Sequence, residues 1–402
     1  MGSRKFDYPV RESCNNMATS NSDRSLTWYA AREPIVLGVL TLLAIAGFAG
    51  VSALSRLFHR QQQARGTRWY NRGTVDLTAG SLRRAVADFR TAMLFSRDNY
   101  SYQLGLAEAL AAQGSAGKQE AYVYLLDLWE REPENGTVNL TLARILAEKG
   151  DKDEALRYYH NAIYALWKDN PDAERRGARL ELAEFLLHEN AITQAQAELI
   201  ALSGDLPDDP ALHIRVGDLF MQTQDNVHAL AEYRQGLRMD HQNSKAMAGI
   251  GKAAFELGNY SLSQRSLQEA VARGADSQST QLLDTVNMVR RMDPFQRKIP
   301  ASQRARIVVG AFGTAGRRLQ DCVSRAKPQA TGSPANNEQT LSAQWSVLKP
   351  KITGAGLRRD PDAVEAAMDL VFAIERDTSS ECGAPTGADL ALLLISQLHE
   401  GN

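Results

Sequence analysis

Hydrophobic and small residues recur at helical spacing through the middle of the chain, from about Gly66 to Ala275. When a small residue of one helical segment is aligned with an Ala twelve residues later in the next segment, six units of about 34 residues appear. The third unit shows the pattern clearly, with Ala143, Gly150, Ala155, Tyr159 and Ala162. This pattern predicts six pairs of antiparallel helices and requires no β-strand.

The residue types at these positions have a physical reason. Gly or Ala at a helix crossing lets two helices approach closely, while an aromatic side chain of the second helix fills the gap to the next unit. One unit cannot bury its apolar face alone, so the units must stack, with a concave and a convex side. An ordinary helical bundle with Ala-rich faces would not keep one register over six units. The second unit has four extra residues around Gly114 to Gly117, which we place in the turn between its helices.

The chain before the array divides into a polar and an apolar segment. Residues 1–33 lack apolar periodicity and are predicted to form a disordered tail. Ile35 to Leu54 is a run of twenty residues without a charge, enough for a helix to cross about 30 Å of hydrocarbon. We therefore predict a transmembrane helix at residues 34–55. A signal peptide is the alternative, but its apolar part is usually about 7 to 15 residues long and no clean cleavage site follows this run.

Small residues form a stripe on one face of this apolar segment, at Ala46, Ala49, Gly50 and Ala53. Such a stripe lets membrane helices pack together, so a homodimer through these residues is one hypothesis. Small residues are also common in membrane helices that do not pair. The stripe alone therefore leaves both alternatives open.

The chain after the array is predicted to be helical as well. Residues 278–326 are predicted to be capping helices that pack on the end of the array, because the apolar register continues there. Residues 327–337 are rich in Pro, Gly, Ser and Asn and are predicted to be a linker. Residues 338–402 form a small helical unit, with Asp360 as an N-cap and Pro361 at the first helical position of its clearest helix.

The order of residue types in each unit resembles the tetratricopeptide repeat. Its apolar or Trp residue, small residue, Ala, aromatic residue and second Ala correspond in the first unit to Trp69, Gly73, Ala85, Phe89 and Ala92. The resemblance covers six units at residues 66–277. The layout of a single span, this array and a helical tail also resembles membrane-anchored tetratricopeptide-repeat proteins of bacteria. The fold class expected is all-α: one N-terminal transmembrane helix, an α-solenoid and a small C-terminal helical unit.

Composition and motifs argue against catalysis. The formal net charge is -1, which does not favour a nucleic-acid partner. The seven His residues are scattered without metal-ligand spacing, so we expect no metal site and no cofactor. The glycines that follow Val309 lack the spacing of a nucleotide loop, and no nucleophile motif of the Gly-x-Ser-x-Gly type appears. We therefore expect no catalytic residues and no enzyme activity.

The resemblance implies a binding groove on the first helices of the units. The positions that contact ligands in the family correspond here to Tyr70, Tyr102, Leu106, Arg144, Glu184, Leu187, Asp218, Met221, Lys252 and Phe255. This mixture departs from the Lys and Asn clamp of members that hold a C-terminal carboxylate, and suits a mixed apolar and charged segment better. The first function hypothesis is a membrane-anchored scaffold or adaptor that binds a partner protein or peptide. The alternative is a structural or assembly subunit of a larger membrane complex.

Two signals disagree about the side of the membrane on which the array lies. The resemblance to bacterial proteins implies the inner membrane, and the basic residues after the span favour a cytoplasmic array. These basic residues are Arg56, Arg60, Arg65 and Arg68. Against this, Cys322 and Cys382 both lie near helix ends in the terminal region and would pair in an oxidising compartment; two buried free thiols are the alternative. We lean slightly to an exoplasmic, periplasmic array.

Overall fold

The computed structural model describes residues 23–325 and 337–399, with side chains from residue 36 onward. Its helices are α1 (Asp23–Thr78), α2 (Leu82–Phe95), α3 (Tyr100–Ala112), α4 (Ser115–Arg131), α5 (Gly136–Lys149), α6 (Lys152–Tyr164), α7 (Pro171–His188), α8 (Ile192–Ser203), α9 (Pro210–Gln222), α10 (Asn226–Met239), α11 (Ser244–Glu256), α12 (Tyr260–Ala272), α13 (Ser277–Met292), α14 (Ala301–Arg325), α15 (Asn337–Leu348), α16 (Gly354–Arg359), α17 (Pro361–Glu381) and α18 (Gly387–His399). These residues contain no β-strand, only an isolated bridge between Asn135 and Leu166. The predicted all-α class is confirmed.

The chain divides into two compact units, one ending at Glu132 and the other beginning at Pro133. The first contains α1 to α4 and the second contains α5 to α18. Six helical hairpins follow one another between residue 66 and Ala272 in the described chain, as the repeat spacing predicts. The unit boundary lies between the second and third hairpins, a division that the sequence pattern did not indicate.

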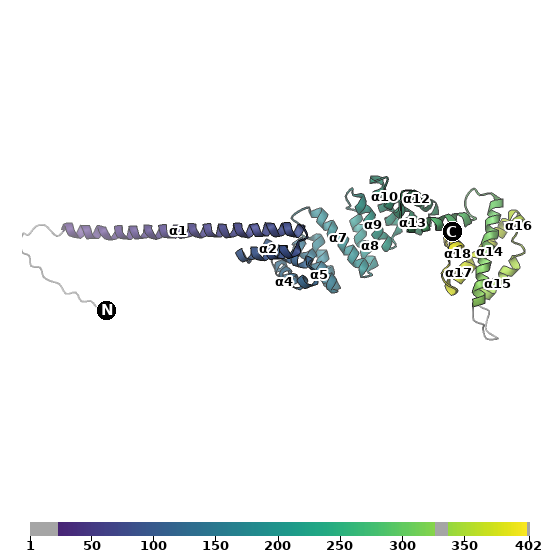
Figure 1. Cartoon of the computed structure of the whole chain (residues 1–402), viewed down its shortest axis with the longest axis horizontal. Coiled ribbons are helices and arrows are strands. Elements are labelled where there is room, and N and C mark those ends of the chain that lie inside the picture. Colours follow the sequence, from purple (N-terminus) through teal and green to yellow (C-terminus); the bar gives the residue numbers. More distant parts are fainter. Residues whose placement is uncertain (1–22, 326–336, 400–402) are drawn as a thin grey trace, which may run out of the picture. The chain divides into compact units, whose positions relative to one another are not determined.

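Helix α1 dominates the first unit as one continuous helix of 56 residues (Figure 1). Its part from Val36 onward is long and apolar enough to cross a membrane, and the apolar side chains there are exposed. The helix begins at Asp23, so the prediction of a disordered tail up to residue 33 is wrong for its last residues. Once a helix exists, each added residue gains a backbone hydrogen bond, so it extends into the polar flank. Residues 1–22 lie outside the described part.

The end of α1 is also the first helix of the first repeat. Gly73 on α1 and Gly105 on α3 face the ring of Phe89 on α2, and a Cβ added at these glycines would lie 2.9 and 2.7 Å from the ring. Phe89 is 1% exposed. The aromatic ring of a second helix thus fills the space between two first helices, as the spacing predicts.

The extra residues of the second repeat after Gly114 lie in a helix and not in the turn. Helix α4 begins at Ser115 and has 17 residues, against 14 in α2. Gly114 has φ +91°, a conformation that favours glycine, and Gly117 packs against the backbone of Leu110. The insertion therefore adds a first turn to α4, because Gly117 allows this turn to lie against the end of α3.

The second unit repeats the same packing between glycines. Tyr233 on α10 is 1% exposed and lies between Gly217 on α9 and Gly249 on α11. Side chains of the preceding turns cap the helices: the Asn243 side chain, for example, accepts a hydrogen bond from the Ala246 backbone N–H at 3.0 Å. The helix cap at Asn243 and the packing of Tyr233 between two glycines therefore both fit the repeat pattern in α9 to α11.

Helices α14 to α18 share one hydrophobic core at the end of the second unit. Phe312 on α14 stacks on Trp345 of α15 with ring centroids 5.7 Å apart, and the Trp345 ring fits against Gly316. Asp360 caps α17 and Pro361 is its first residue, as predicted. Helix α14 was expected to belong with the array, but its apolar face is part of the core of these terminal helices. We call α14 to α18 the terminal unit. Residues 326–336, most of the predicted linker, lie outside the described part.

Candidate functional site

The groove positions of the first unit are largely buried. Tyr70 is half-buried and stacks on Tyr102, with ring centroids 5.4 Å apart. Tyr102 is 5% exposed and Leu106 is 0% exposed. Tyr102 lies in the core because Gly66 on α1 leaves room for its ring, and Leu106 is buried in the core as well. Their assignment to a surface open to a partner is therefore wrong, whereas Tyr70 keeps a partly exposed ring.

The charged groove positions of the second unit form ion pairs between neighbouring repeats. Arg144 on α5 donates two hydrogen bonds to Glu181 on α7, at 2.6 and 2.8 Å. Arg215 on α9 donates to Glu184 on α7 at 2.5 and 3.0 Å. The hydrogen bond to Glu181 raises the pKa of Arg144. The first helices of three successive repeats are thus joined through paired charges.

Glu181 and Arg215 were not predicted as site residues. Each lies three positions before a predicted residue, Glu184 or Asp218, and the two are 34 residues apart, as the repeat requires. That spacing was an available signal. The ion pairs connect residues of two neighbouring repeats. The pattern of residues within one repeat therefore could not predict them.

A pocket of about 500 Å³ lies on the face lined by α9 and α11, and we call it the groove pocket. Asp218 and Lys252 line it together, with Asp276 at the start of α13. Lys252 lies 3.8 Å from Asp276, and Asp218 accepts a hydrogen bond of 2.6 Å from the Tyr233 hydroxyl. Burial, and next the bond to Asp218, raises the pKa of Tyr233, which therefore keeps its proton as a donor. The groove pocket is therefore lined by both acidic and basic side chains.

Three apolar groove positions recur at intervals of 34 residues, at Leu187, Met221 and Phe255. Each lies in the last turn of a first helix and is half-buried. The Phe255 ring packs against Tyr260, with ring centroids 5.6 Å apart. These side chains provide apolar contact area beside the charged positions.

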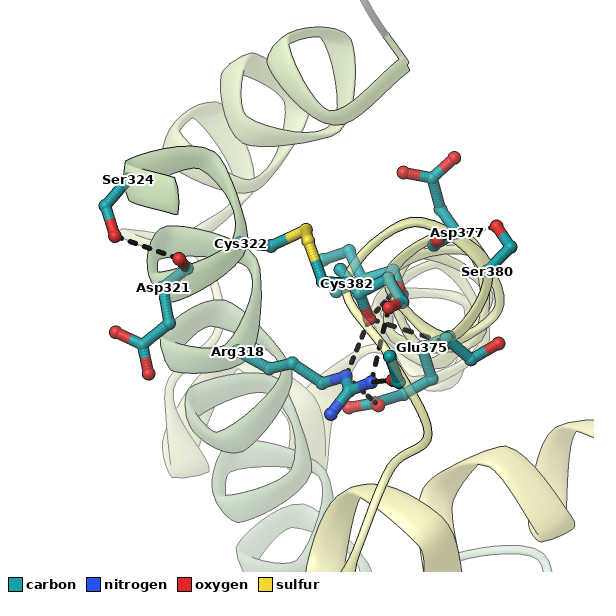
Figure 2. The surroundings of a disulfide bond; sticks show 12 residues. Arg318, Asp321, Cys322, Ser324, Glu375, Asp377, Ser380 and Cys382 are labelled. Atoms are coloured by element: carbon teal, nitrogen blue, oxygen red, sulfur yellow. Dashed lines mark hydrogen bonds and ion pairs between the residues drawn. A yellow bond between two sulfur atoms is a disulfide. The ribbon is translucent and has the colours of Figure 1, made fainter. Parts of the chain in front are cut away.

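The two cysteines of the terminal unit are joined in a disulfide between α14 and the end of α17 (Figure 2). The Cα atoms of Cys322 and Cys382 are 5.7 Å apart, and the residues are separated by 60 positions in the chain. This distance is usual for a disulfide. The bond holds the loop that begins at Gly383 against α14.

A buried cluster of Arg318, Glu375 and Asp389 lies beside the disulfide. Arg318 on α14 donates hydrogen bonds to the Thr378 hydroxyl at 2.8 Å and to the Gly383 carbonyl at 2.8 Å. Its Nε lies 3.5 Å from Glu375, which is 0% exposed, and its Nη1 lies 3.6 Å from Asp389. Burial, and next the charge of Asp389, raises the pKa of Glu375 to about 8, an effect that Arg318 opposes. Figure 2 shows Arg318 reaching from α14 toward this cluster.

Two further expectations concern a metal site and the small-residue stripe of α1. No group of three or more His, Cys, Asp or Glu residues that could hold a metal occurs in the ranges whose side chains the structure describes, 36–325 and 337–399. A side chain added at Gly50, in the small-residue stripe of α1, would have open space around it. Pairing of two chains through this stripe stays a prediction.

Comparisons with known proteins give partial similarities. No family model matches the chain. Cellulose synthase operon protein C of Xanthomonas axonopodis pv. citri (strain 306) is 28% identical over 164 residues, which is 41% of this chain and 10% of that protein. The chain therefore covers only about a tenth of that relative.

Among solved structures, PilF of Pseudomonas aeruginosa has a TM-score of 0.42 and 15% identity, covering 55% of this chain and 97% of that one. The C-terminal part of a tetratricopeptide-repeat protein from Cytophaga hutchinsonii has a TM-score of 0.43 and 9% identity, covering 78% of this chain and 98% of that one. The assignment to a class rests on this chain itself. Its six hairpins, its spacing of about 34 residues and its glycine-to-aromatic contacts define a tetratricopeptide-repeat protein.

Proposed function

We propose that the protein is a membrane-anchored scaffold or adaptor that binds a segment of a partner protein, and that it is not an enzyme. The observation that carries this proposal is the groove pocket, which brings Asp218 and Lys252 from two repeats to one surface. Its mixed charges and the neighbouring half-buried Met221 suit a polypeptide segment with charged and apolar side chains.

One observation favours the second candidate, a structural or assembly subunit of a membrane complex. Arg144 and Glu184 are already engaged by partners in neighbouring repeats. Paired charges stabilise the array itself, and a groove of this kind needs no transient ligand. We prefer the adaptor because the groove pocket remains accessible next to the paired residues.

The form of α1 supports an anchor that holds the first repeat near the bilayer. The apolar run ends at Leu54, and the helix continues without a break to Gly66, the first buried residue of the repeat. Twelve residues at 1.5 Å each amount to about 18 Å. A continuous helix cannot act as a flexible tether, so we propose that the first repeat keeps a set distance from the membrane surface. The full chain should then stay in the membrane fraction after alkaline carbonate extraction.

We further propose that the repeats lie on the exoplasmic, periplasmic side of a bacterial inner membrane. The geometry of Cys322 and Cys382 suits a disulfide, and disulfides persist in oxidising compartments. The arginines after the span favour the opposite side, but the helix continues directly from them into the first repeat. The arginines therefore belong to the helix of the first repeat on whichever side of the membrane the array lies, so they are a weak signal of its side.

A charge reversal tests the adaptor. Lys252→Glu in the full chain should release a partner that wild type retains in native-membrane purification, because it reverses a charge that lines the groove pocket. Arg265→Glu, on an exposed surface of α12, is the matched control and should retain the partner. A complex of constant stoichiometry that both variants keep would favour the structural subunit instead.

A labelling experiment tests the topology. The native Cys14 is first replaced by Ser, because it precedes the span and would itself be labelled from outside if the array were cytoplasmic. In this background an engineered cysteine, Arg265→Cys, should react with a membrane-impermeant thiol reagent in intact cells. Cys322 and Cys382 should react only after reduction and unfolding, since they are paired. No label on intact cells, together with two free native thiols after lysis under acid quench, would place the array in the cytoplasm.

A further inference from the structure

A second pocket, of about 350 Å³, lies between the end of α6, the first half of α7 and the end of α8. Three arginines of α7 line it, Arg175, Arg176 and Arg179. We call it the arginine pocket. It shares no lining residue with the groove pocket, and none of the residues predicted from the sequence lies in it. The proposed adaptor function does not use it.

The arginines of this pocket make weaker contacts than those of the groove. Arg176 lies 3.4 Å from Asp205, and Arg179 lies 3.4 Å from Glu198. Arg175 lies 4.0 Å from Asp172. The Arg144 guanidinium, in contrast, makes two hydrogen bonds of 2.6 and 2.8 Å to one carboxylate.

Some N–H groups of these arginines therefore remain available to donate hydrogen bonds. A guanidinium has five N–H donors. The Nε atoms of Arg175 and Arg179 are buried and make no hydrogen bond within the described chain, although the Arg179 Nε forms an ion pair with Glu198 at 3.4 Å. Buried donors without an acceptor are unfavourable, so an acceptor that enters the pocket gains more than it would at an exposed arginine.

Two of the three carboxylates beside these arginines can move aside, whereas the third, Glu198, is only 19% exposed and stays next to Arg179. The side chains of Asp172 and Asp205 are 77% and 69% exposed, so they can turn into water at little cost. Arg176 and Arg179 are only 20% and 21% exposed, so their positions are held by the surrounding protein. Buried Leu202 forms part of the wall, and an apolar wall strengthens charge interactions beside it.

We propose that the arginine pocket binds an oxyanion, a phosphate or carboxylate group carried on a small molecule or on a protein side chain. Guanidinium groups match the geometry of both anions with paired hydrogen bonds. The volume exceeds what a single oxyanion needs and lies within the range of small-molecule sites. Arg175 supplies a buried Nε donor without a partner, and Arg179, one helical turn away, adds its positive charge beside it.

Thermal unfolding of the purified full chain tests the proposal. Inorganic phosphate should raise the unfolding temperature in a saturable way, compared with chloride at equal ionic strength. Glutarate, a dicarboxylate, shows which of the two anions is preferred. Arg175→Gln should weaken the affinity by about tenfold, the loss expected for one charge-assisted hydrogen bond. Arg265→Gln, on exposed α12, is the control and should leave the affinity unchanged.

A second variant protects the test against a simple folding defect. Asp205→Asn removes a competing carboxylate from the pocket, so it should tighten phosphate or glutarate binding relative to wild type. Equal shifts with chloride, or equal affinities in wild type, Arg175→Gln and Asp205→Asn, would overturn the proposal.

Discussion

The repeats α5 to α12 and the terminal unit α14 to α18 are stabilised in different ways. In the repeats, an aromatic ring such as Tyr233 packs between glycines of neighbouring first helices, and the charged groups pair at the surface. In the terminal unit, a disulfide and the buried pair of Arg318 and Glu375 lie beside the apolar core. The repeats thus depend on contacts between neighbours, whereas the terminal unit depends on contacts across 57 to 60 positions of the chain.

Removing the disulfide should have the largest effect, because it should destabilise the terminal unit and not the repeats. Cys322→Ala with Cys382→Ala should lower the stability of the terminal unit by roughly 4 kcal/mol, because the chain between the cysteines gains freedom when unfolded. Hydrogen exchange measured by mass spectrometry should rise in α14 to α18 and change little in α5 to α10. Exchange that rises equally in both regions would contradict the distinction between them.

The buried Glu375 should make the terminal unit sensitive to pH. Its pKa in the folded protein is raised from 4.5 to about 8, and burial also raises the pKa of Asp389. The folded state therefore holds protons that the unfolded state releases, so stability is greatest below about pH 4.5 and is lost as pH rises toward 8. The loss should approach about 1.4 kcal/mol per pH unit in that range.

Denaturant unfolding followed at several pH values measures this slope. Glu375→Gln keeps the shape of the side chain but cannot release a proton, so it should flatten most of the profile. A wild-type profile that is already flat between pH 5 and 8 would show that Glu375 stays ionised beside Arg318.

A pair of glycine substitutions tests the packing of the repeats. Gly249→Ala should destabilise the array by roughly 1 to 3 kcal/mol, because the new methyl group would overlap the Tyr233 ring. Gly177→Ala in α7 has open space and should stabilise by up to about 1 kcal/mol through better helix propensity. Opposite shifts in the unfolding midpoint are expected. Shifts of the same sign would contradict the assigned contact between α10 and α11.

The smallest effect is expected at the surface ion pairs. Arg144→Gln should cost no more than about 1 kcal/mol, because half of the arginine side chain is exposed to water. A double-mutant cycle with Glu181→Gln isolates the energy of the pair, and high salt should reduce it. A coupling well above that limit would mean that the repeats also depend on charge.

Much of the fold could be predicted because its signals are local. The cap at Asp360 and Pro361 follows from two adjacent residues, and the six hairpins follow from one repeated spacing. The start of α1 was misplaced because composition does not show how far a helix propagates. The extra turn of α4 was missed because the space beside Leu110 depends on packing.

The candidate site was predicted less well. The repeat register placed Arg144 and Glu184 on a partly exposed face, but the same register placed Tyr102 and Leu106 in the buried core. Whether a position on a first helix reaches a partner depends on what the neighbouring repeat places over it. The arginine pocket was missed for the same reason, since its lining comes from three helices.

The sequence by itself determined the helical class, the repeat length, the long apolar segment and the absence of recognisable catalytic motifs. These depend on residue types at short and regular intervals, which act through helix periodicity and the contact of neighbouring units. Only the tertiary structure decided that α14 shares the core of the terminal helices, that Arg318 meets Glu375, and which groove charges are already paired. Such contacts join residues far apart in the chain, and their strength depends on burial, which exists only after the chain has folded.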